Sequence, residues 1–157
     1  MSSAVVYESS FGNTRRVAEQ VAETIGATYL LSVDETPPDL SGLDLLVIGG
    51  PTHVHGMSRE STRKAAIDQG ATALAGIGVR GWLDRMPRVD GLRAAAFDTR
   101  ADKPALVTGS AARGIAKALK RHGCTVVSSA SFLVTGTAGD LADGEAERAA
   151  GWARELA

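Results

Sequence analysis

The feature that most constrains the fold of this chain is a small polar loop between an apolar run and an amphipathic segment. Residues 4–7 read Ala-Val-Val-Tyr, which predicts a short buried strand, and residues 9–14 read Ser-Ser-Phe-Gly-Asn-Thr. From Thr14 onward apolar residues recur at helical spacing, and charged residues occupy the other face. A strand, a short polar loop and a helix direct backbone N–H groups and the positive end of the helix dipole at one point. The sequence therefore predicts a phosphate-binding loop at residues 9–14.

Two other interpretations apply to this region. Serine, glycine and asparagine are common wherever a strand turns into a helix, so a loop that only caps the helix is the alternative to phosphate binding. Arg15 and Arg16 follow the loop directly. Their helical spacing favours a solvent-exposed face over a contact with the phosphate.

Apolar segments alternate with helical patterns along the rest of the chain. Further strands are predicted at 28–33, 43–50, 92–97 and 125–134, and further helices at 59–69, 82–86, 110–122 and 142–156. This alternation is typical of an α/β fold, in which right-handed crossovers build a parallel sheet with helices on both faces. In the final helix, Ala142, Ala146, Ala149, Ala153 and Leu156 are expected to face the core.

Two more polar loops follow strands of the predicted sheet. The second loop begins after Gly49-Gly50 and covers residues 51–58, and the third covers residues 98–109. Because the carboxyl ends of parallel strands meet at one edge, where ligands of such sheets bind, one ligand could contact all three loops.

Length and composition narrow the classes of function. At 157 residues the chain is expected to form one domain over residues 1–157. A net charge of −1 gives no basis for nucleic-acid binding, and the apolar runs are too short to span a membrane. Cys124 is the only cysteine, so neither an intramolecular disulfide nor a thiolate metal cluster can form. We expect a cytoplasmic protein.

Two local patterns suggest other ligands. His53 and His55 lie two residues apart, but no further ligand lies nearby at metal-binding spacing, so we expect no metal site. Residues 76–81 read Gly-Ile-Gly-Val-Arg-Gly and match the dinucleotide-binding pattern literally. No convincing strand precedes them and Pro87 ends the following helix early, so a flexible loop is the preferred interpretation.

The first loop and its flanks resemble the flavodoxin-like family, whose phosphate loop usually reads Thr/Ser-x-Thr/Ser-Gly-x-Thr. The resemblance covers nearly the whole chain, including the Gly-Gly-Pro-Thr break after the third strand. It implies a doubly wound five-stranded parallel sheet in the order 2-1-3-4-5, of the short-chain type, with flavin mononucleotide (FMN) as cofactor. The cofactor-binding residues that it implies are Ser9, Ser10, Phe11, Gly12, Asn13 and Thr14 for the phosphate, Pro51, Thr52, His53, Val54, His55 and Gly56 at the flavin ring, and Asp98, Thr99 and Arg100 in the third loop.

The chain departs from the family in three respects. Phe11 stands where a hydroxyl is usual, and neither ring-facing loop contains the Trp or Tyr that commonly stacks on the flavin. The sequence leaves open whether His53, His55 or Trp82 takes that place. The strongly acidic surface of flavodoxin electron carriers is also absent.

The resemblance implies an FMN-binding protein that transfers electrons to and from a redox partner protein or an NAD(P)H-linked reductase. An electron carrier is favoured over a stand-alone enzyme, and no catalytic residue is identified. The alternatives are an NAD(P)H-dependent quinone or flavin oxidoreductase, whose site an oligomer would complete, and a flavodoxin-like interaction module that binds no flavin.

Overall fold

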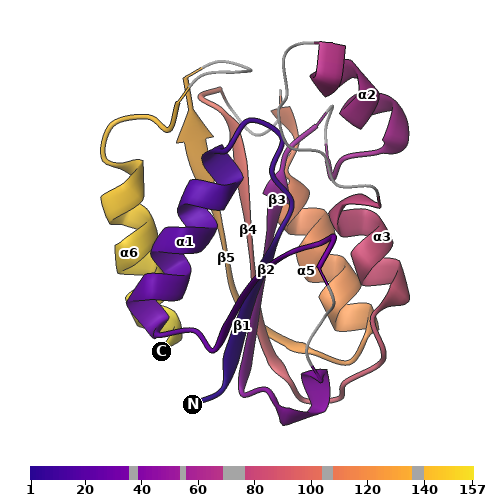
Figure 1. The fold of residues 1–157 in the computed structure, drawn as a ribbon. Helices are drawn as coiled ribbons and strands as arrows, with labels where there is room; N and C mark the ends of the chain where they lie inside the picture. Colours follow the sequence, from indigo (N-terminus) through magenta and orange to yellow (C-terminus); the bar gives the residue numbers. More distant parts are fainter. Residues whose placement is uncertain (36–38, 54–55, 69–76, 104–107, 136–139) are drawn as a thin grey trace.

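The computed structural model describes residues 1–35, 39–53, 56–68, 77–103, 108–135 and 140–157. Its centre is a parallel sheet of five strands in the order β2-β1-β3-β4-β5 (Figure 1). The strands are β1 (Ser3–Tyr7), β2 (Tyr29–Ser32), β3 (Leu45–Pro51), β4 (Arg93–Ala101) and β5 (Thr125–Val134). The α/β fold and the strand order 2-1-3-4-5 expected from the sequence are confirmed.

Helices cover both faces of this sheet (Figure 1). The helices α1 (Asn13–Ile25) and α6 (Glu145–Leu156) pack on one face, and α3 (Gly78–Arg85) and α5 (Ala111–Arg121) pack on the other. The helix α2 (Glu60–Asp68) lies at the carboxyl end of the sheet, and a 3-10 turn, η1 (Leu40–Gly42), precedes β3. No helix in the described ranges is long and apolar enough to cross a membrane.

The helix α1 forms as its sequence pattern predicts. Val17, Ala18 and Val21 are fully buried against the sheet. The helix ends at Gly26, whose φ of 62° suits glycine far better than any residue with a Cβ. Arg15 and Arg16 form exposed ion pairs with carboxylates, which confirms the solvent-exposed face.

The packing at the centre of the sheet depends on a glycine, Gly49, in β3. Gly49 and Phe97 are direct neighbours in the register of β3 and β4, and a Cβ on Gly49 would lie 2.0 Å from the Phe97 ring. Phe97 also makes edge contacts with Phe132 and Trp152, at centroid distances of 6.2 and 6.1 Å. The glycine thus leaves the space in which this buried aromatic cluster packs.

The strand β4 is longer than the sequence pattern indicates. Asp98, Thr99 and Arg100 were expected at the start of a loop, but they belong to the strand, which continues to Ala101. The reason is the partner strand, because β3 runs on to Pro51 and pairs Gly50 with Asp98 and Pro51 with Thr99. The third loop therefore begins only after Ala101.

The expectation of a flexible loop at residues 76–81 is wrong for Gly78–Gly81, which form the first turn of α3. Glu8, 1% exposed, accepts hydrogen bonds from the Val79 N–H and from Ser58 Oγ, both at 2.7 Å. A buried carboxylate at the first turn of a helix is stabilised by the helix dipole. Residues 69–76, which include the start of the pattern, lie outside the described residues.

The helix α6 begins at Glu145, so Ala142 precedes it, and Ala146 is exposed instead of facing the core. Glu145 takes the inward position. Its Oε2 accepts a hydrogen bond from the Leu133 N–H at 2.7 Å, and Arg148 donates to the Ser131 carbonyl. Both backbone groups belong to the free edge of β5, so α6 satisfies edge groups that would otherwise be open to pairing.

Candidate functional site

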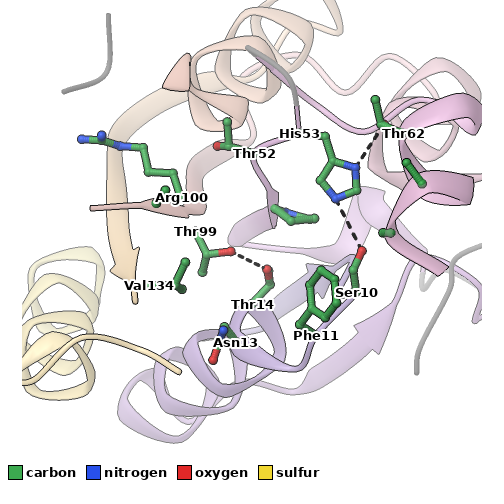
Figure 2. A pocket seen from close by; sticks show the side chains of 14 residues that line it. Ser10, Phe11, Asn13, Thr14, Thr52, His53, Thr62, Thr99, Arg100 and Val134 are labelled. Carbon is green, nitrogen blue, oxygen red and sulfur yellow. Dashed lines mark hydrogen bonds between the residues drawn. The ribbon is translucent and has the colours of Figure 1, made fainter. Parts of the chain in front are cut away.

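A cleft of about 290 Å³ lies at the carboxyl edge of the sheet (Figure 2). Its walls come from the loop after β1, the segment after β3, the helix α2 and the ends of β4 and β5. The lining residues are Ser10, Phe11, Asn13, Thr14, Pro51, Thr52, His53, Thr62, Ala65, Ala66, Thr99, Arg100, Ala101 and Val134. The structure thus brings residues of all three predicted loops to one cleft.

The first loop turns sharply before α1. Gly12 occupies the position before the helix with φ 94°, and it offers no side chain to cap the helix start. Ser9 Oγ lies behind the loop, where it accepts hydrogen bonds from the N–H groups of Gly12 at 3.1 Å and Arg15 at 3.4 Å. Ser9 therefore supports the loop from within, while Ser10, Asn13 and Thr14 line the cleft.

Thr14, at the start of α1, contacts Thr99 at the end of β4. Their hydroxyl oxygens are 2.8 Å apart, and both residues are almost fully buried (Figure 2). This contact joins the start of α1 to the end of β4.

His53 lies between the first loop and α2 (Figure 2). Its Nε2 is 3.5 Å from Ser10 Oγ, and its Nδ1 is 3.0 Å from Thr62 Oγ1. Burial lowers the pKa of His53 below the ordinary value of 6.5; the carboxylate of Glu8 acts in the opposite direction, and Arg63 lowers the pKa further. The neutral imidazole is therefore the dominant form near pH 7.

Asp98 does not line the cleft. It is fully buried, and its Oδ2 accepts hydrogen bonds from Ser110 Oγ at 2.6 Å and from the Ala112 N–H at 2.9 Å. It therefore fixes the start of α5, with Ser110 as the predicted cap. Thr52 Oγ1 accepts from the Ala111 N–H at 3.1 Å, which ties the second loop to the same helix.

Arg100 forms the outer part of the cleft. Its Nη1 donates to the Lys103 carbonyl at 2.6 Å, and its guanidinium points away from His53 (Figure 2). Its Nε is buried and has no hydrogen-bond partner among the described residues.

The second loop is only partly described. Pro51, Thr52 and His53 line the cleft, and Gly56 exchanges two backbone hydrogen bonds of 2.7 Å with His53. Val54 and His55, which the resemblance places at the flavin ring, lie outside the described residues.

Trp82 is not available to stack on a ligand in this cleft. It is 5% exposed and packs in the core between α3 and the sheet, where it borders a different cavity with Met86 and Leu40. Among the described lining residues, the aromatic rings are those of Phe11 and His53.

Sequence reasoning missed the contribution of α2. Thr62, Ala65 and Ala66 line the cleft from this helix, and Ala101 and Val134 close it from β4 and β5. Residues 62, 65 and 66 share one helical face, and they are small. That pattern, next to a predicted ligand loop, is a signal that could have indicated them.

The chemistry of the lining fits a phosphorylated flavin. Hydroxyl groups come from Ser10, Thr14, Thr52, Thr62 and Thr99, and apolar surface comes from Pro51, Ala65, Ala66, Ala101 and Val134. No carboxylate is among the described lining residues, so none there would repel a dianion. The start of α1, whose N-cap residue Gly12 has no side chain, supplies the positive end of a helix dipole.

No protein-family model matches the sequence, and no curated protein is significantly similar to it.

Solved structures are similar in fold. A flavodoxin from the domain Archaea is 19% identical, with 99% of this chain and 96% of that chain covered and a TM-score of 0.64. Oxidised flavodoxin 1 from Bacillus cereus is 18% identical, with 99% and 97% covered and a TM-score of 0.69. A flavodoxin, WrbA-like protein from Agrobacterium tumefaciens is 19% identical, with 99% and 94% covered and a TM-score of 0.63. Taken with the strand order, these likenesses show that the chain adopts the flavodoxin-like fold.

Proposed function

We propose that the chain binds FMN in this cleft and takes part in electron transfer. The observation that carries the proposal is a hydroxyl-lined cleft, free of carboxylates in its described part, at the start of α1. The similarity to solved flavodoxins supports it.

In this proposal the first loop and the start of α1 hold the phosphate. Ser10 and Thr14 donate their hydroxyl protons, and Gly12 lets the backbone approach closely because no Cβ is present. Ser9 supports the loop from behind. Bound FMN would supply the electron-transfer chemistry. The chain's own contribution is to orient the cofactor and to exclude water from it with Pro51 and the α2 alanines.

The proposal is tested by titrating the purified apoprotein with FMN and, separately, with riboflavin, which lacks the phosphate. Binding is followed by the change in flavin fluorescence. We expect FMN to bind at least tenfold more tightly than riboflavin, which corresponds to about 1.4 kcal/mol or more from the phosphate contacts. Equal affinity for the two flavins would contradict the phosphate site, and no binding of either would leave the interaction module as the function.

Thr14→Val tests the site assignment with a change of one hydroxyl. A charge-assisted hydrogen bond contributes about 1.5–3 kcal/mol, so we expect FMN affinity to fall roughly tenfold or more. Thr24→Val is the matched control, because Thr24 lies near the other end of the same helix, where it bonds to the Gln20 carbonyl. Equal FMN affinities in the two variants would place the phosphate elsewhere.

A second function within the same chemistry is reduction of quinones by NAD(P)H. The similarity to the flavodoxin, WrbA-like protein from Agrobacterium tumefaciens is the observation for which we retain this second function. Steady-state NAD(P)H oxidation by the FMN-loaded protein, with and without a quinone, separates the two functions. NAD(P)H oxidation that requires a separate reductase supports the electron carrier. The partners that we propose for this carrier are a redox protein or an NAD(P)H-linked reductase, and the proposed location is the cytoplasm.

A further inference from the structure

The hydrogen bonds around Thr62 favour one position for the proton of the neutral His53 ring. The Thr62 hydroxyl donates to the Arg59 carbonyl at 3.0 Å and accepts from the Arg59 N–H at 2.8 Å. A hydroxyl has one proton to donate and two lone pairs. With that proton on the Arg59 carbonyl the hydroxyl can only accept, and the 3.0 Å contact then places a proton on His53 Nδ1.

The other ring nitrogen then faces the cleft as an acceptor. In the neutral imidazole Nε2 has no proton, so its contact with Ser10 Oγ requires Ser10 to donate. At 3.5 Å this hydrogen bond is long, and hence weak. The Ser10 proton is turned toward His53, and a ligand oxygen must compete for it.

Charged groups around His53 come from three elements. Glu8, after β1, and Arg63, on α2, act on the ring in opposite senses, and both bond to Ser58 Oγ, at 2.7 and 3.0 Å. Arg100, at the end of β4, borders the same cleft. The effects of Glu8 and Arg63 on the pKa of His53 oppose one another. A dianion bound beside Ser10 would therefore raise this pKa, because its negative charge stabilises a proton on Nε2.

We propose that His53 is a specificity-determining residue of the phosphate site, which binds the anion by taking up a proton at Nε2. Protonated Nε2 donates to Ser10 Oγ or to the anion itself, and Ser10 turns its own proton to a phosphate oxygen. The anion thus gains charge-assisted donors that a neutral ligand cannot recruit. This inference rests on the proposed function, since it takes the phosphate to lie at Ser10.

The coupling has a defined sign. An anion that raises the pKa of His53 must, by linkage, bind more tightly to the protonated form. Affinity therefore rises as the pH falls through the pKa of His53 in the complex. A rise of about one pKa unit corresponds to about a tenfold gain in affinity between the high-pH and the low-pH limits.

The test follows the Cε1–H resonance of His53 by NMR in the wild-type protein as a function of pH. The protein is free, or saturated with FMN, with riboflavin or with inorganic sulfate, which does not titrate in this range. His53→Gln assigns the resonance. His122 serves as the internal reference, because it lies at the end of α5, remote from the cleft. We expect FMN and sulfate to raise the pKa of His53 by about one unit and riboflavin to leave it unchanged.

The outcomes separate this inference from the proposed function. If FMN binds, as flavin fluorescence reports, and the pKa of His53 stays at its free value, the inference is wrong and the proposed function stands. If FMN does not bind but sulfate raises the pKa, the anion site stands and the flavin function fails. If neither ligand moves the pKa, the proton-linked site is overturned.

Affinity measurements supply the second readout. The wild-type protein and the control variant His122→Gln are expected to bind sulfate about tenfold more tightly at low than at high pH. In His53→Gln this pH dependence should disappear, because glutamine cannot titrate. A pH dependence that persists in His53→Gln would assign the linked proton to another group.

Discussion

Thr14 Oγ1 lies 2.8 Å from Thr99 Oγ1, although 85 positions separate the two residues in the sequence. The pair holds two hydroxyl protons, and their mutual hydrogen bond uses one of them. The other is left for a further acceptor, and both residues line the cleft. The pair therefore connects two elements of the site and can also donate to a ligand oxygen.

Thr99→Val should weaken both the fold and the site. Loss of one partner of a buried hydrogen bond costs about 1 kcal/mol in the free energy of unfolding, measured by urea denaturation of the apoprotein. FMN affinity should fall several-fold, because Thr14 loses the Thr99 hydroxyl that fixes its orientation. The double variant Thr14→Val/Thr99→Val completes a cycle, and strictly additive effects would show that the two hydroxyls act independently.

Gly49→Ala should destabilise the protein strongly. The new methyl group would lie 2.0 Å from the Phe97 ring, which is fully buried and cannot move aside. Overpacking of this kind costs about 1–3 kcal/mol or more, measured as the change in the urea midpoint. Gly42→Ala is the control, because a Cβ there meets no atom within 4 Å. If Phe97→Leu failed to relieve any of the loss in Gly49→Ala, the clash would not be its cause.

Asp98→Asn should loosen the start of α5. The carboxylate accepts from Ser110 Oγ and the Ala112 N–H, and its negative charge lies at the positive end of the helix dipole. Hydrogen bonds to charged groups contribute about 1.5–3 kcal/mol, so we expect a loss of about 1–3 kcal/mol in the free energy of unfolding. Asp102→Asn, at an exposed position, should change the stability little. Similar losses in both variants would argue against a specific role for Asp98.

Glu145 should make the stability depend on pH. Its hydrogen bond to Arg148, with a smaller contribution from the Leu133 N–H, lowers the pKa of Glu145 below the ordinary 4.5. Since the unfolded state then binds the proton more readily, the stabilisation is complete above pH 4.5 and is lost as the pH falls through the lowered pKa.

Urea denaturation at a series of pH values, for wild type and Glu145→Gln, measures this effect. Glutamine keeps an acceptor for Leu133 but has no charge, so the difference in stability should shrink toward low pH. Glu155→Gln is an exposed control on the same helix. A difference that stays constant over the whole pH range would show that the charge contributes nothing.

Local signals were sufficient for the turn between β1 and α1, for α1 itself and for the cap of α5. Helical periodicity, Gly26 and Ser110 act within a few residues of the elements that they define, so the sequence pattern contains the whole cause. The parallel sheet followed from the alternation of strands and helices, and the order of its strands followed from the resemblance alone.

Contacts between distant residues decided the rest. The extension of β4 through Thr99 depends on its pairing with Pro51, and the start of α3 depends on the carboxylate of Glu8. Neither cause lies near the residues that it affects. The small helical face of α2, with Ala65 and Ala66, was a signal in the sequence, but the position of that face over the cleft depends on contacts between distant residues.

The hydrogen bond from the Val79 N–H to the buried Glu8 carboxylate joins residues that lie 71 positions apart in the sequence. During synthesis on the ribosome, the carboxylate therefore lacks this partner until Val79 has left the exit tunnel. Thr14 lacks its own partner until residue 99 of the 157 has followed. We expect the nascent chain to bind FMN, its proposed ligand, only late in translation, and arrested chains that end before β4 to bind none.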